Sequence, residues 1–283
     1  MFIQSSKHKD YAVILHVNNY HDININLNLS GIEVKTSIYE SIDRNKNSIV
    51  IKNNNTENGN IFKAFAATLY DNILEKSFDE DIEIIIKDTI NDYQSYFAGT
   101  KKQLGELEQQ GLFGELLFLK EKYLNKVENI VDYWEGIYKN KHDFVLSNTS
   151  YEIKTTRNQT RLTVHISNEC QLDRKFVKEL KLVVYRVEKI TAGKTIYDLY
   201  KEILNLLPNN KKNLFKSKMI QAGFDENNVE YYLGFKAIEK YIFNVDDNFP
   251  KIDKNMCNDR IFEVKYHIDL DGIDSEKEVY LSE

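Results

Sequence analysis

Cysteine and proline are both scarce in this sequence. Its 283 residues include only two of each, a composition that argues against a disulfide-stabilised secreted scaffold. No apolar run is close to the roughly 18 residues that a membrane-spanning helix needs, and the first ten residues contain no hydrophobic signal segment. These absences predict a cytoplasmic protein that has no disulfides and does not enter a membrane.

Several common catalytic motifs are also missing. The cysteines Cys170 and Cys257 stand alone, and no Cys/His cluster has the spacing of a zinc site. There is no Gly-x-Ser-x-Gly motif and no glycine-rich loop that could hold nucleotide phosphates. We therefore expect neither a serine hydrolase nor an ATPase, and we interpret His142 and His165 as structural histidines, because lone histidines seldom form a metal site.

Charged residues are abundant, at 29% of the chain, and one arrangement of them points to chemistry. In residues 142–154, HDFVLSNTSYEIK, Asp143 precedes Glu152 and Lys154 on two expected strands joined by a polar turn. A turn centred on Asn148-Thr149 would put Asp143 opposite Lys154, with Glu152 on the same face and Ile153 on the other. Two carboxylates about 5 Å apart repel by about 3 kcal/mol at an effective dielectric near 20, so such a pair shares a proton or holds a cation.

The Glu-x-Lys pattern occurs twice more, as Glu33-Val-Lys35 and Glu263-Val-Lys265. If Ser30-Gly31 is the turn of the first copy, Asn26 lies across from Lys35. The nearest upstream acid, Asp22, would then be about 13 Å away, too far to share an ion. Too little chain follows the third copy to complete a layer around it. We interpret both copies as ordinary solvated strand faces.

The elements around residues 142–154 are expected in the order helix, strand, strand, strand, helix, strand. Residues 111–124 have an apolar stripe at helical spacing, with Glu115 at its edge. After the two strands of the central motif, residues 161–167 alternate like a third strand. Residues 168–180 resemble a short helix with Ser167 as its N-cap, and residues 181–190 a buried strand.

In this order, GLFGELLFL, Trp134-Glu135-Gly136, HDF, YEIKTT and ISNECQL resemble a bacterial, defence-associated subfamily of the PD-(D/E)xK nucleases, the superfamily of restriction endonucleases. The resemblance is strong over residues 105–190 and weaker toward both ends. One departure is that His142, and not proline, precedes Asp143. The resemblance implies an α/β fold with a restriction-endonuclease-like core, in which a mixed sheet is flanked by helices in the order αβββαβ.

The resemblance also implies a magnesium site. Asp143 and Glu152 would ligate Mg²⁺, for which Mn²⁺ would substitute, and the Ile153 carbonyl would supply a further oxygen. Two carboxylates suffice because Mg²⁺ keeps several water ligands. Glu115 would reach the metal directly or through water, whereas without the resemblance it would be taken for a solvated helix residue.

Two other roles follow from the same resemblance. Lys154 would orient or polarise the attacking water, or offset the charge that develops in the transition state. Gln171 would position the water or the scissile phosphate; without the resemblance it would be taken for a surface residue.

Net charge is −6 for the whole chain, yet residues 151–220 hold fifteen Lys and Arg against seven Asp and Glu. Such a basic stretch beside the motif could follow DNA phosphates, although a charge run can equally be a solvated face. The candidate DNA-binding residues are Arg157, Arg161, Arg174, Lys175 and Lys178, and Lys181, Lys211, Lys212, Lys216 and Lys218 extend the run.

Three segments are expected. Residues 1–98 should form an antiparallel sheet covered by helices, residues 99–190 the nuclease core, and residues 191–283 a mainly helical and β extension. Two functions remain open: a Mg²⁺-dependent DNA endonuclease of a restriction or anti-phage defence system, and a catalytically silent module that binds DNA or partner proteins. An RNA or repair-intermediate nuclease would use the same site. Expected partners are DNA, a second copy of the chain, and a helicase-like ATPase or methyltransferase.

Overall fold

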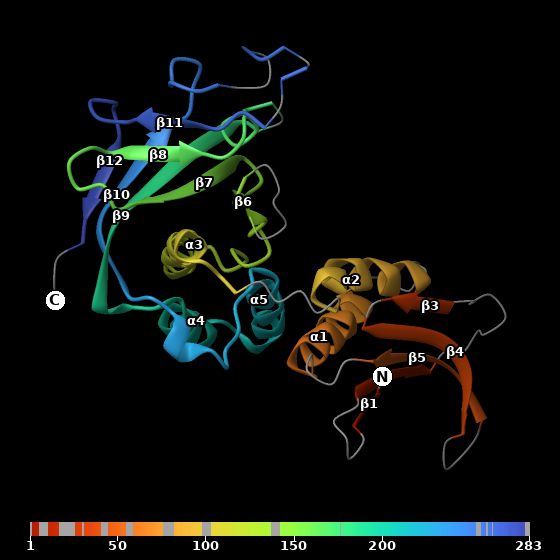
Figure 1. Ribbon diagram of the computed structural model, residues 1–283. Coiled ribbons are helices and arrows are strands. Elements are labelled where there is room, and N and C mark those ends of the chain that lie inside the picture. The colour runs from red at the N-terminus through yellow and green to blue at the C-terminus, as the bar shows by residue number, and fades with distance from the viewer. Residues whose placement is uncertain are drawn as a thin grey trace. The chain divides into compact units, whose positions relative to one another are not determined.

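The structure is a computed structural model that divides into two compact units (Figure 1). It describes residues 2–5, 11–16, 26–29, 31–40, 45–54, 59–75, 82–97, 103–136, 142–175, 177–252, 256–258, 260–261 and 263–280. The first unit contains residues 1–103 and 209–223, and the second contains residues 104–208 and 224–283. The segment 191–283, expected to be one extension, is thus shared between the two units.

The first unit is a five-stranded antiparallel sheet with helices, as the alternating pattern predicts. The strand order is β1-β2-β5-β4-β3. The strands are β1 (Phe2–Ser5), β2 (Tyr11–His16), β3 (Asn26–Leu29), β4 (Ile32–Glu40) and β5 (Asn45–Asn53). The helices are α1 (Gly59–Glu75), α2 (Ile82–Phe97) and α5 (Asn209–Gln221). The expected apolar face of α1 is buried against the sheet, with Phe65 and Leu69 fully covered.

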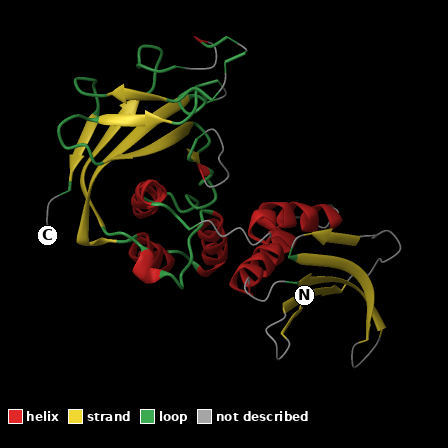
Figure 2. Cartoon of the chain, viewed as in Figure 1, coloured by secondary structure: helices red, strands yellow, loops and turns green. Residues whose placement is uncertain are grey.

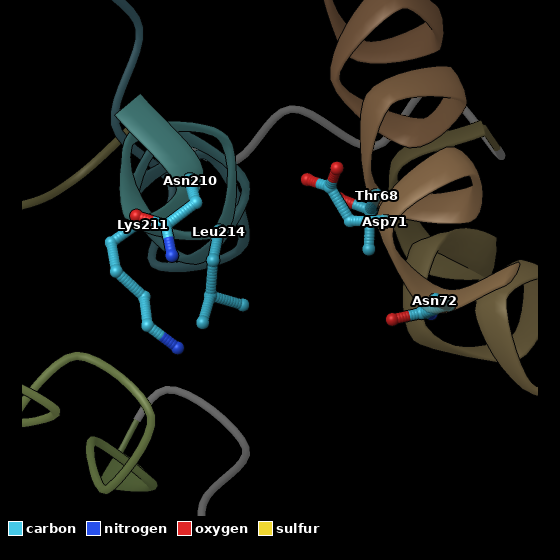
Figure 3. A pocket seen from close by; sticks show the side chains of 6 residues that line it. All are labelled: Thr68, Asp71, Asn72, Asn210, Lys211 and Leu214. Carbon is cyan, nitrogen blue, oxygen red and sulfur yellow. The ribbon is translucent and has the colours of Figure 1, made fainter. Parts of the chain in front are cut away.

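A pocket in this unit lies between α1 and α5. Figure 3 shows three side chains from each helix facing one another across it. The lining residues are Thr68, Asp71, Asn72, Asn210, Lys211 and Leu214. None of the candidate catalytic residues belongs to this unit, so the pocket is separate from the site described below.

The second unit is built on a mixed sheet with the strand order β12-β10-β9-β7-β6. The β7–β9 pair is parallel and the other pairs are antiparallel. Its strands are β6 (Phe144–Val145), β7 (Thr149–Thr156), β9 (Glu179–Lys194), β10 (Phe235–Asn244) and β12 (Glu276–Val279). The strands β8 (Thr163–Ile166) and β11 (Tyr266–Asp269) form a separate two-stranded sheet. The helices are α3 (Glu106–Leu124), α4 (Ile196–Leu206) and the 3-10 turn η3 (Val229–Tyr231).

The two faces of the mixed sheet are covered by different layers (Figures 1 and 2). Helix α3 packs closely on β7, because Gly114 leaves room for Ile153, Thr155 and Tyr185 beneath it. On the opposite face, Leu182 and Val184 of β9 share a core with residues of β8 and β11. The even-numbered residues of β7 therefore face away from α3, and its odd-numbered residues face toward it.

The expected helix at residues 168–180 is wrong. This stretch forms turns, and β9 begins within it at Glu179. The cause is local competition by short polar side chains: Asn168 Oδ1 accepts from the Cys170 N–H at 2.9 Å, and Asp173 Oδ1 accepts from the Lys175 N–H at 2.8 Å. Such bonds stabilise turns, and a helix could form here only if these bonds were lost.

The third expected strand of the core does form, as β8, but it pairs with β11 and does not join the mixed sheet. The mixed sheet instead continues through β9 into β10 and β12, which come from the C-terminal part of the chain. Residues 235–244 form strand β10. None of the described helices has the length and hydrophobicity to cross a bilayer.

Two glycines of α3 provide a matched test of how closely the helix packs on the sheet. A Cβ at Gly114 would lie 2.5 Å from the Thr155 methyl carbon, whereas a Cβ at Gly111 would have nothing within 4 Å. Gly114→Ala should therefore lower the free energy of unfolding by about 1–3 kcal/mol through overpacking. Gly111→Ala should raise it by about 0.5–1 kcal/mol through helix propensity. Urea denaturation of both variants checks this, and equal midpoints would contradict the packing described.

Candidate active site

The hairpin that carries the acidic residues has a different register from the one expected. Phe144 pairs with Tyr151 and Val145 with Ser150, and the Leu146 N–H donates to the Thr149 carbonyl at 3.1 Å. The turn is thus centred on Ser147-Asn148, one residue earlier than expected, so Asp143 aligns with Glu152 and not with Lys154. Moving the turn by one residue shifts the strand pairing by two residues. Asp143, Glu152 and Lys154 are therefore still expected on one face of the hairpin.

Asp143 is fixed at the end of β6 by backbone contacts. Its Oδ2 accepts a hydrogen bond from the Ile153 N–H at 2.7 Å. Its carbonyl accepts from the N–H groups of Glu135 and Gly136, at 2.7 and 3.0 Å. The carboxyl is thereby held against the middle of β7 although β6 itself begins only at Phe144.

Glu152 and Lys154 lie together on the face of β7 opposite to Ile153, as side-chain alternation predicts. Lys154 Nζ is 2.8 Å from Glu152 Oε1. The Glu152 side chain is 1% exposed and that of Lys154 is 15% exposed. The ammonium is therefore the more accessible of the two charged groups.

Gln171 contacts Lys154 but comes from a turn and not from the expected helix. Its Oε1 accepts from Lys154 Nζ at 3.1 Å and from the Ser167 N–H at 2.8 Å. The second bond anchors the amide to the end of β8, so Gln171 holds the ammonium in place. The resemblance predicted a role for Gln171 within a helix. The structure places this residue in a turn.

Glu115 is oriented by a tryptophan whose role the sequence did not indicate. Trp134 Nε1 donates to Glu115 Oε2 at 2.6 Å, and the indole is completely buried. A Cβ at Gly136 would lie 2.6 Å from Asp143 Oδ1 and 3.0 Å from Glu115 Oε2. These two oxygens are consequently at most about 6 Å apart, on either side of a position where only glycine fits. The segment Trp134-Glu135-Gly136 contributed to the resemblance, but its contacts were not predictable from it.

Burial gives the three acids unusual protonation. It raises the pKa of Glu152 to about 8, with a further contribution from Asp143. Burial likewise raises the pKa of Asp143, and burial together with the Asp143 charge raises the pKa of Glu115 well above its ordinary range. Lys154 offsets these effects only in part. The site therefore has more buried carboxyl groups than its own ammonium can neutralise.

The donor set suits a hard divalent cation. Asp143, Glu152 and Glu115 offer carboxylate oxygens, the ligands that Mg²⁺ prefers, and a cation would reverse the pKa shifts that burial causes. Within the described residues, no three Asp, Glu, His or Cys side chains converge tightly enough to form a metal site by themselves.

The first of the other Glu-x-Lys copies behaves as a solvated strand face. Asn26 lies across from Lys35, as expected, and Asp22 lies outside the described residues. Glu33 forms an ion pair with Lys35, whose side chain is 58% exposed. The hydrogen bond from Lys35 lowers the pKa of Glu33, the opposite of the shift at Glu152. The same three-residue pattern therefore has opposite electrostatics in the two units.

The third copy is not in a strand. Glu263 has a positive φ of 56°, and β11 begins only at Tyr266. The backbone at this position cannot present Glu263 and Lys265 on one strand face. Only the copy at residues 152–154 combines the pattern with burial and a nearby second acid.

Ion pairs neutralise much of the predicted DNA-binding run. Each of the three arginines lies beside an acid: Arg157 with Glu106, Arg161 with Asp269, and Arg174 with Asp247. Lys175 and Lys178 are exposed. The lysines at 211, 212, 216 and 218 lie on α5 in the first unit, and Lys218 is buried. The charge excess in the sequence is therefore not one continuous basic surface of the second unit.

The two histidines near the motif have different surroundings. His142 is buried, which agrees with a structural role. His165 is exposed on β8 and its ring centroid is 4.9 Å from that of His267, its cross-strand partner. The pairing of His165 with His267 could not be predicted, because β11 is about one hundred residues away from β8 in the sequence.

A family model, DUF4420, matches residues 1–271 and is described as "Putative PD-(D/E)XK family member". No curated protein and no solved structure matches the chain. The match covers both compact units, and so it includes the sheet and helices of the first unit as well as the candidate site.

The raised pKa of Glu152 predicts an unusual pH dependence of stability in the presence of a chelator. The folded protein binds the Glu152 proton more tightly than the unfolded chain does, since the pKa rises from 4.5 to about 8. The stabilising contribution is thus present below pH 4.5 and is lost as the pH rises toward 8, at up to about 1.4 kcal/mol per pH unit. Glu152→Gln should flatten the fall of the melting temperature between pH 5 and 8.

Glu33→Gln is the matched control. Its carboxyl has a lowered pKa, so it is already ionised over this pH range in both states, and the variant should follow the wild-type curve. Parallel curves for wild type and Glu152→Gln would contradict the assigned burial of the Glu152 proton.

Proposed function

Because the chain belongs to this PD-(D/E)XK family, we propose that it is a metal-dependent nuclease that hydrolyses DNA phosphodiester bonds. The observation that carries the proposal is that the buried Glu152 and the half-buried Asp143 and Glu115 lie beside Lys154, with the pKa of each carboxyl raised. A cluster of this composition is costly unless a cation compensates it. Such clusters occur at functional sites more often than in structural cores.

Asp143, Glu152 and Glu115 would hold Mg²⁺ or Mn²⁺, together with the Ile153 carbonyl. The Ile153 N–H points toward Asp143 at the edge of β7. The N–H and the carbonyl of one strand residue leave the strand on the same side, so this carbonyl oxygen faces the same edge. A bound divalent ion would supply charge stabilisation and a more acidic water.

Lys154 would bind a non-bridging phosphate oxygen and offset the negative charge that develops during cleavage. Burial lowers its pKa, but the carboxylates of Glu152 and Asp143 outweigh this effect and raise it. The ammonium therefore stays protonated, which favours charge stabilisation over proton abstraction. Gln171 would keep the ammonium directed at the phosphate through its bonds to Lys154 and Ser167.

A catalytically silent binding module is the second candidate. It is favoured by the fact that Asp143 Oδ2 already accepts from the Ile153 N–H and that Glu152 Oε1 is already paired with Lys154. In this interpretation the acids would serve only to position Lys154. The two candidates differ in whether a divalent ion is required for any activity.

The wider setting is also part of the proposal. The resemblance to defence-associated nucleases supports a role in restriction or anti-phage defence in the cytoplasm. It also supports assembly with a second copy, or with a helicase-like ATPase or methyltransferase. The first unit, which the family model includes, is the natural candidate for such partner contacts because the candidate catalytic residues all lie in the second.

Plasmid nicking tests the nuclease proposal. The wild-type chain should cleave with Mg²⁺ or Mn²⁺ and lose activity with EDTA. Lys154→Ala should lower the rate by about 100-fold or more, since it removes the ammonium that lies beside the acids in the described part of the chain. Lys35→Ala, which removes the lysine of the exposed Glu-x-Lys copy, should leave the rate unchanged.

Cleavage that is indifferent to both EDTA and Lys154→Ala would remove this site as the catalytic centre. An absence of cleavage with retained DNA binding would favour the silent module. Parallel assays on duplex DNA, flap substrates and RNA identify the substrate class.

A further inference from the structure

The two-stranded β8–β11 sheet has one buried and one exposed face. Val164, Ile166 and Ile268 point into the core of the second unit. His165 and His267 are directly paired across the strands on the exposed face. Lys265, two residues before His267 and also exposed, continues this face toward Ser167.

A chain of polar contacts links this exposed face to the candidate active site. Lys154 Nζ and the Ser167 N–H both donate to Gln171 Oε1. Ser167 Oγ is in turn 3.5 Å from His165 Nδ1, and the His165 ring contacts that of His267. The histidine pair is therefore linked, through Ser167 and Gln171, to the ammonium of Lys154.

The groups that face this pair are mostly basic. Partial burial lowers the pKa of His165, and the charges of His267 from β11, Lys154 from β7 and Lys265 lower it further. On the same face of β11, two residues beyond His267, Asp269 lies beside Arg161. Groups that destabilise each other's positive charge in this way would be stabilised by a bound anion.

We propose that His165 and His267, with Lys265, form a binding subsite for a backbone phosphate of the nucleic-acid strand whose scissile phosphate lies at Lys154. The inference rests on the proposed function and names a positioning surface for it. Imidazole N–H groups and an ammonium donate to phosphate oxygens without reading bases. The ribbon would therefore fix the register of the strand and contribute affinity that is independent of sequence.

The arginines expected from the sequence are poorer candidates for this task. Arg157, Arg161 and Arg174 each already lie beside a carboxylate, which a phosphate would have to displace. Within the described part of the chain, neither Lys265 nor either histidine of the pair forms an ion pair. This is why the ribbon, and not the run of arginines, is assigned the phosphate contact.

The test measures duplex DNA binding by the full-length chain in EDTA, where the acids have no cation and no cleavage occurs. His165→Ala/His267→Ala should weaken binding about tenfold at low salt, as expected for lost contacts to a charged group. The slope of log affinity against log salt should become shallower by about 1. His165→Lys/His267→Lys should restore both affinity and slope, which a purely structural role would not predict.

Thr163→Ala, on the same exposed side of β8 but without a charge, is the matched control and should bind like the wild type. If the alanine pair binds with wild-type affinity and slope, or if the lysine pair fails to restore binding in a protein that melts like the wild type, the subsite is overturned. Mg²⁺-dependent cleavage by the wild type would then still stand, so failure of the subsite and failure of the nuclease proposal give different results. If the alanine pair unfolds, the single variants and the lysine pair decide the question.

Discussion

The second unit depends on one electrostatic constraint: one buried and two half-buried carboxyl groups lie beside one ammonium at the edge of a sheet. Asp143, Glu152 and Glu115 each have a raised pKa because burial disfavours their charged form. Among the described residues, Lys154 is the compensating charge beside Glu152. Such a group of residues weakens a fold at neutral pH unless a cation joins it, so its presence is better explained by chemistry than by stability.

Local packing keeps these groups together. Gly114 lets α3 approach β7 closely enough for Glu115 to reach the acids, and Gly136 leaves the space between Glu115 and Asp143 open. Trp134 fixes the carboxyl of Glu115 by a hydrogen bond from a completely buried ring. The Glu33-Val-Lys35 copy lacks all of these neighbours, and there the pKa of the glutamate is lowered. Surroundings, and not the motif itself, give the site its properties.

The sequence predicted which candidate residues lie together better than it predicted the elements that carry them. Side-chain alternation put Glu152 and Lys154 on one face whatever the turn, because shifting the turn centre by one residue shifts the pairing by two. Gln171 was identified through resemblance, although its expected helix is replaced by turns around Asn168 and Asp173. The pairing of β8 with β11 could not be predicted, since alternation alone does not identify a partner strand so distant in the sequence.

Counting charges along the chain overestimates how much of a basic run is available to a nucleic acid. The excess over residues 151–220 is divided between the two units, and within the second unit the three predicted arginines lie beside acids. Charges neutralised in this way contribute little to a phosphate-binding field, because a binding phosphate must compete with a carboxylate already in place. The groups that remain near the acids are the ammonium of Lys154 and the basic residues of the β8–β11 ribbon. Under the proposed function, recognition of a strand at this site would therefore depend on tertiary pairing between distant segments more than on the local density of lysine and arginine.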